Sequence, residues 1–100
     1  MSTFISLLNF TEQGIHGYQD TVKRAEGTRE AARSLGGQVK EIYWTLGPYD
    51  AVVIAEFPDD ESATAFGLKT GSLGNVRTCT LRSFNRDELR PIIERAAAAG

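Results

Sequence analysis

The chain has little of what several kinds of functional site require. Its 100 residues include one cysteine, Cys79, and one histidine, His16. A single cysteine forms no disulfide within the chain and no thiolate metal cluster, and His16 has no acidic or cysteine companion at metal-ligand spacing. The sequence therefore predicts no zinc or iron site, and we expect Cys79 to be a small buried residue of a strand.

Neither charge nor hydropathy is concentrated in one region. Eleven basic and thirteen acidic residues leave a formal charge of −2 without a basic run, whereas phosphate binding needs a concentrated cationic surface. The apolar runs are far too short to span a membrane, and Met1 to Thr3 lead directly into a β-type stretch without the regions of a signal peptide. We therefore expect a cytoplasmic protein that binds neither nucleic acid nor membrane.

The composition is that of an ordinary globular domain. Hydrophobic residues make up 41% of the chain, and nine residues are aromatic. A length of 100 residues suffices for one modest core, and no linker or low-complexity segment interrupts the sequence. We expect one domain over residues 1–100, with a core at 3–84 and a final helix at 86–98.

The most informative stretch runs from residue 42 to residue 57 and predicts a β-hairpin. β-branched and aromatic residues fill two arms, which are joined at Gly47-Pro48-Tyr49-Asp50. Pro48 presets φ at a turn position and Asp50 can cap turn amides. A turn closed at Pro48 and Tyr49 predicts the following cross-strand pairs: Leu46 with Ala51, Trp44 with Val53, Ile42 with Ala55, and Glu41 with Glu56.

Hydrophobic periodicity and capping signals predict the remaining elements. The helix that starts at Asp20 or Thr21 is expected to bury a thin stripe and to turn its charged residues, Arg24 among them, mostly outward. In chain order the expected elements are a strand at 3–10, a loop at 11–18, a helix to Leu35, strands at 38–46 and 50–57, a helix capped by Asp59 and ending at Gly71, a strand at 76–84, and the C-terminal helix.

This β-α-β-β-α-β order predicts an α+β, ferredoxin-like, four-stranded antiparallel sheet with its first and third strands in the centre and both helices on one face. The face without helices is too apolar to be left in water; it includes Val39, Tyr43, Thr45, Val52 and Ile54. We expect a second copy of the chain to cover it, giving a dimeric α+β barrel. The C-terminal helix is the alternative cover.

The chain resembles GYD-domain proteins over about residues 3–84. The resemblance lies in ordered short motifs: Thr11 to Ile15, Leu35 to Gly37 with Lys40 and Glu41, Gly47 with Tyr49 and Asp50, Pro58 to Asp60, and Gly71 to Thr78. It implies a small bacterial or archaeal protein with a ferredoxin-like fold of the dimeric α+β-barrel type and no established activity. No catalytic residue can be carried over from the family.

Five residues are candidates for a catalytic or ligand-binding role. Asp50 or His16 could act as a base, and Tyr18, Tyr43 or Tyr49 could contact a ligand. The structural alternative is that Asp50 satisfies turn amides and that His16 is an exposed loop residue.

Two functions follow from these candidates. The first is a homo-oligomeric protein, binding a small apolar or aromatic ligand or acting as an accessory protein. The second is a cofactor-free enzyme, similar to the monooxygenases or isomerases of the dimeric barrel, with His16 or Asp50 as its base. Fold analogy alone supports the enzyme.

Overall fold

Four strands form one antiparallel sheet in the order β2-β3-β1-β4. The computed structural model describes all residues, Met1–Gly100. Its elements are β1 (Ser2–Phe10), α1 (Glu12–His16), the short 3-10 helix η1 (Tyr18–Asp20), α2 (Thr21–Ser34), β2 (Gln38–Trp44), β3 (Ala51–Phe57), α3 (Asp60–Ser72), β4 (Val76–Ser83) and α4 (Arg86–Ala98).

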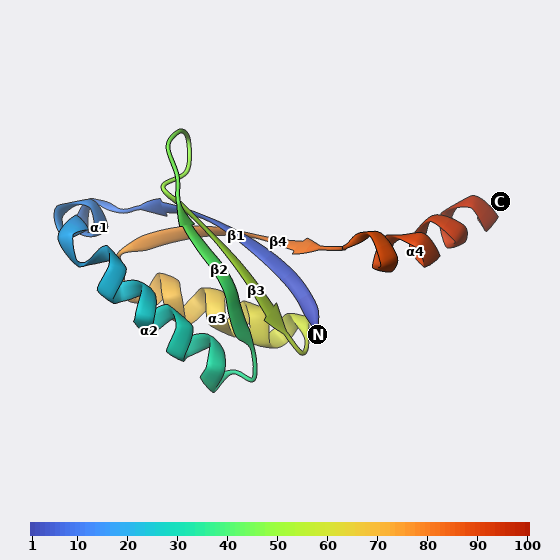
Figure 1. Ribbon diagram of the computed structural model, residues 1–100, viewed down its shortest axis with the longest axis horizontal. Helices are drawn as coiled ribbons and strands as arrows, with labels where there is room; N and C mark the ends of the chain where they lie inside the picture. The colour runs from blue at the N-terminus through green and yellow to red at the C-terminus, as the bar shows by residue number, and fades with distance from the viewer.

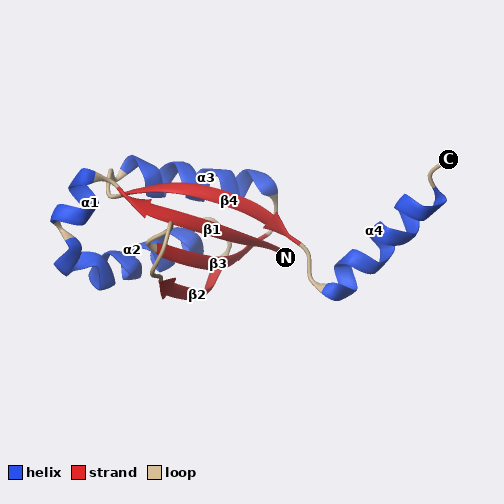
Figure 2. Ribbon diagram, turned by 90° about the horizontal axis from the view of Figure 1, so that it is seen from above, coloured by secondary structure: helices blue, strands red, loops and turns tan.

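The two long helices of the β-α-β-β-α-β order, α2 and α3, lie on the same side of the sheet. Figure 1 shows α2 and α3 below the strands, and Figure 2 shows the opposite face of the sheet without a helix. β1 and β3 are the central strands, as the prediction requires, and the ferredoxin-like α+β arrangement is confirmed. None of the helices combines the length and apolar character needed to cross a bilayer.

The core lies between the sheet and these two helices. Its centre is a group of three aromatic rings, in which Phe57 is 1% exposed and has its ring centroid 6.0 Å from that of Phe4 and 5.0 Å from that of Phe66. Alternation along β3 buries Ala51, Val53, Ala55 and Phe57 on this side. The helix-facing side of the hairpin is therefore the apolar side that the pattern predicts.

The predicted pairing of the hairpin is wrong by two residues. Trp44 pairs with Ala51 rather than Val53, and Glu41 lies opposite Ile54, so Glu41 and Glu56 do not face each other. The reason is that β1 binds Asp50: the Asp50 amide donates to the Leu8 carbonyl (2.8 Å). The ladder between β2 and β3 ends at Trp44 and Ala51, and one further bond joins the Thr45 amide to the Asp50 carbonyl (2.9 Å), which leaves a wider connection than a tight turn.

A β-bulge at Lys40 reverses which face of the sheet the preceding residues of β2 point to. The pairing shifts between Val39 and Glu41, so Val39 points toward the helices and is 5% exposed. The prediction that Val39 lies on the helix-free face is wrong for this reason, because a bulge adds one residue and inverts the alternation.

The helix-free face carries a continuous apolar group at its centre. Ile5, Leu7, Val52 and Ile54 are half-buried there, and Tyr43 is 53% exposed. Cys79 lies opposite Leu7 on the edge strand and is exposed, so its predicted burial is wrong. The alternation of β4 places its side chain on the face that no helix covers.

α4 does not cover that face either. It leaves the end of β4 and extends away from the rest of the molecule (Figures 1 and 2). A capping box between Asn85 and Glu88 starts the helix, and Leu89, Ile92 and Ile93 are exposed along it. The alternative prediction, that the C-terminal helix covers this face, is therefore wrong within one chain.

The predicted loop after β1 contains a short helix, α1. The Thr11 hydroxyl accepts from the Gly14 amide (3.1 Å) as its N-cap, and the Thr11 amide donates to the Asn75 carbonyl (3.1 Å). The loop prediction overlooked this helix because five residues carry little periodic signal.

The N-cap of α3 predicts a dependence of stability on pH. Hydrogen bonds from the Ser62 hydroxyl and its amide hold the pKa of Asp59 below its ordinary 3.8. A lowered pKa means that the capping contribution is present in full above pH 3.8 and is lost as the pH falls through the lowered value. Asp59→Asn caps the helix without titrating. Urea unfolding from pH 7 to pH 2 should show the wild type losing stability relative to Asp59→Asn only at the acidic end; parallel curves would contradict this.

Candidate functional site

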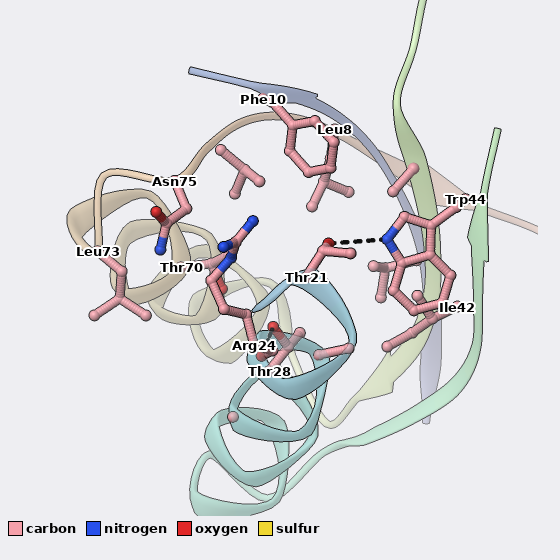
Figure 3. A pocket seen from close by; sticks show the side chains of 15 residues that line it. Leu8, Phe10, Thr21, Arg24, Thr28, Ile42, Trp44, Thr70, Leu73 and Asn75 are labelled. Carbon is pink, nitrogen blue, oxygen red and sulfur yellow. Dashed lines mark hydrogen bonds between the residues drawn. The ribbon is translucent and has the colours of Figure 1, made fainter. Parts of the chain in front are cut away.

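A cavity of about 290 Å³ lies between the sheet and the N-terminal half of α2. Its walls come from β1, α2, β2 and β3 and from the end of α3 with the connection to β4, and nine of its fifteen lining residues are hydrophobic. Figure 3 shows the side chains converging on this space from several elements. Thr21, Arg24, Ala25 and Thr28 share one face of α2 because they follow helical spacing.

Trp44 forms the wall of the cavity at the end of β2. Its indole Nε1 donates to the hydroxyl of Thr21, another lining residue (3.0 Å; Figure 3), and 45% of Trp44 is exposed. Trp44 is the one tryptophan of the chain. The structure places this ring at the cavity wall.

Arg24 is the one charged residue that lines the cavity. Its guanidinium donates to the Gly17 carbonyl (2.6 Å) and to the Gly14 carbonyl (3.3 Å). Gly14 is held close to the α3–β4 connection, since a Cβ there would lie 1.9 Å from the Asn75 carbonyl oxygen. The loop that orients Arg24 is therefore fixed by backbone packing, and the prediction that Arg24 faces outward is wrong.

The five candidate residues from the sequence do not line this cavity. The side chain of His16 is 81% exposed at the end of α1, with its Nε2 4.0 Å from Glu12 Oε2. Tyr18 is 59% exposed in η1, and Tyr43 lies on the helix-free face. Tyr49 and Asp50 are half-buried at the hairpin. Their ligand and base roles stay predictions.

No group of three or more His, Cys, Asp or Glu side chains is arranged to hold a metal ion. The cavity wall instead offers hydroxyls from Thr21, Thr28 and Thr70, the amide of Asn75 and the guanidinium of Arg24. This arrangement can bind an apolar body and orient it through a few polar contacts.

Comparison with known proteins connects this structure to a family. The GYD domain model matches residues 4–93. The chain belongs to the GYD-domain family. The match covers most of the chain and continues beyond β4 into α4.

Two relatives of this GYD-domain protein come from Thermus thermophilus. A protein named glutamine synthetase and cystathionine beta-lyase binding protein is 34% identical over 85 residues, which are 84% of this chain and 90% of the relative. The crystal structure of TTHA0845 superposes with a TM-score of 0.56 at 30% identity, covering 85% of this chain and 95% of the other.

Gly47 and Asp50 of the hairpin motif have structural roles in this GYD-domain protein. Asp50 Oδ2 accepts from the Phe10 amide (2.8 Å), and the Asp50 amide donates to the Leu8 carbonyl (2.8 Å). Gly47 takes a positive φ of 122°, which favours glycine. These contacts attach the hairpin loop to the end of β1 beside the cavity.

Asp50→Ala should destabilise the fold by about 1.5–3 kcal/mol, because the Phe10 amide loses a carboxylate acceptor in a half-buried position. Asp50→Asn keeps an acceptor oxygen and should lose less. Urea unfolding of the three proteins measures both effects. An Asp50→Ala variant as stable as the wild type would show that the bond contributes nothing.

The residues that form the cavity gave only a weak signal in the sequence. Thr21, Arg24, Ala25 and Thr28 recur at helical spacing, and a helix face that mixes small, hydroxyl and guanidinium groups differs from a packed apolar stripe. That face could have been selected as a pocket wall. The opposite wall could not, because its distance from α2 depends on tertiary packing.

Proposed function

We propose that this GYD-domain protein is a homo-oligomeric accessory protein, acting in the cytoplasm, that binds a small, mostly apolar ligand in the cavity beneath Trp44. The observation that carries the proposal is the cavity itself, which is near the lower end of the size range of ligand sites and is largely hydrophobic with a few convergent polar groups. The ligand would lie between α2 and the sheet, against the indole ring.

The accessory role is supported by the Thermus thermophilus relative, whose name describes a protein that binds two enzymes. The similarity extends over most of both chains, so a protein partner is a reasonable extension to this chain. We propose that this protein too acts through a partner protein, with the small ligand in the cavity adjusting that association.

The homo-oligomer is supported by the helix-free face. Ile5, Leu7, Val52 and Ile54 form an apolar centre on an open sheet, and α4 does not cover it. Packing the same face of a second copy against it would remove this surface from water and form the dimeric α+β barrel.

The enzyme alternative has less support. It needs a base and an acid that converge within hydrogen-bond reach in a closed pocket. The His16 side chain is in solvent, and Asp50, which does not line the cavity, accepts from the backbone amide of Phe10. The binding function uses the groups that do converge and needs no metal or cofactor.

The cavity is tested by matched leucine substitutions on α2. Ala25→Leu adds volume inside the cavity, whereas Glu26→Leu places the same side chain on the exposed surface one residue later. The probe is 3-phenylpropanamide, a neutral compound with an aromatic ring.

We expect the probe to raise the Tm of the wild type and of Glu26→Leu but not that of Ala25→Leu. Ligand at about 100 times its Kd adds about 2.7 kcal/mol, which corresponds to at least about 10 °C for a domain of this size. Equal shifts in all three proteins, or none in any, would contradict binding in this cavity.

A further inference from the structure

We infer that the ligand carries a carboxylate or a similar planar anion on its apolar body, and that Arg24 binds this anion inside the cavity. The inference rests on the proposed function, because it names the class of ligand for the same cavity. Two features of the cavity support it: the charges of the lining residues and the geometry of the guanidinium.

The charge of Arg24 has no partner in the structure. Arg24 is half-buried, none of the lining residues is acidic, and the ion pairs of the chain all involve other residues. A cation beside an apolar cavity is poorly compensated by protein groups, and the low local dielectric strengthens its attraction to an anion. The cavity is therefore complementary to a negatively charged group.

The guanidinium of Arg24 is also held in one orientation, and some of its N–H donors remain unused. It has five N–H donors, and two hydrogen bonds attach it to the Gly14 and Gly17 carbonyls. Donors therefore remain for a ligand, and these two bonds fix the plane of the group before a ligand arrives. A planar guanidinium with paired donors suits a carboxylate better than it suits a spherical ion.

The remaining walls fit an apolar body attached to that anion. Figure 3 shows Arg24 reaching from α2 into the space near Asn75, the Phe10 ring above it and Trp44 on the opposite side. An aromatic or branched aliphatic body would lie against Phe10, Ile42 and Trp44. Aryl and alkyl carboxylates of this kind have their charge at one end, as the cavity does.

The competing explanation is that Arg24 only holds the loop at Gly14 and Gly17. Arg29 provides the matched control, because it is also a half-buried arginine on α2 and also donates to a backbone carbonyl, that of Val39 (3.3 Å), but it does not line the cavity. Replacing either arginine by glutamine removes one charge from the same helix and leaves amide donors for the backbone carbonyls.

The test compares 3-phenylpropanoate with 3-phenylpropanamide at pH 7, following the fluorescence of Trp44 in the wild type, Arg24→Gln and Arg29→Gln. We expect the carboxylate to bind at least about tenfold tighter than the amide to the wild type and to Arg29→Gln. Arg24→Gln should lose this preference and bind the acid and the amide with about equal affinity.

Each other outcome overturns a defined part of the account. Equal affinity of acid and amide for the wild type, or a preference that survives in Arg24→Gln, overturns the anionic class and leaves the proposed cavity site standing. Binding of neither compound overturns the site as well. If Arg24→Gln does not fold, as judged by circular dichroism, the comparison of acid and amide on the wild type decides the ligand class.

Discussion

Gly37→Ala is expected to destabilise the protein by about 3 kcal/mol or more, because there is no room for a methyl group at this position. A Cβ on Gly37 would lie 2.3 Å from Cδ1 of Phe57 and 2.5 Å from the carbonyl oxygen of Glu56. Neither atom can move easily: Phe57 is 1% exposed in the centre of the core, and Glu56 contributes backbone of a central strand. The start of β2 would have to move away from β3.

Gly27→Ala is the control, since nothing lies within 4 Å of a Cβ at this position in the middle of α2. Alanine should stabilise the helix there by up to about 1 kcal/mol. Urea unfolding of the two variants and the wild type should therefore give changes of opposite sign. A Gly37→Ala protein with wild-type stability would contradict the close packing of β2 on Phe57.

Ile54→Asp is expected to weaken self-association on the order of a hundredfold or more. Ile54 lies opposite Ile5 at the centre of the helix-free face. In the proposed dimer the new carboxylate would be buried without a partner, which costs several kcal/mol. The variant should sediment as a single chain of 10.9 kDa.

Ile54→Val is the matched control, because it keeps a β-branched apolar side chain at the same position, and it should associate like the wild type. Circular dichroism and thermal unfolding establish that both variants are folded. Sedimentation velocity at micromolar concentration then gives the oligomeric state. A wild type that is itself monomeric, or an Ile54→Asp protein that associates equally well, would rule out the sheet-face dimer.

Most of the fold could be predicted from the sequence because its local signals agree with one another. β3 alternates between helix-facing and open sides, and β1 is apolar on both faces, as a central strand requires. Asp59 caps α3 as expected. α2 also ends close to Gly36 and Gly37 as expected, because glycines that stop a helix act within a few positions of the chain.

The hairpin pairing could not be predicted, because it depends on residues far away in sequence. Asp50 bonds to the end of β1, forty residues earlier, and this contact sets where β3 begins. Nothing in the nearby sequence marks the bulge at Lys40. The bulge reverses which face of the sheet the preceding residues of β2 point to. Pairing rules that consider only the two strands overlook both effects.

The candidate site was less predictable than the fold. The motif predicted Tyr49 as a ligand contact and Asp50 as a base. In the structure Asp50 joins the hairpin to β1, and neither residue lines the cavity. Arg24 looked like an ordinary surface charge on a helix. Its position at the cavity depends on the loop around Gly14 and Gly17, whose shape is fixed by packing against Asn75.

Native mass spectrometry of the freshly purified chain tests the central claim most directly, because a single spectrum reports both subunit number and retained ligand. We predict an assembly of two or more 10.9 kDa chains that carries the additional mass of a small molecule, with Ala25→Leu forming the same assembly without that mass. A bare monomer would contradict the account, and so would an added mass that Ala25→Leu retains.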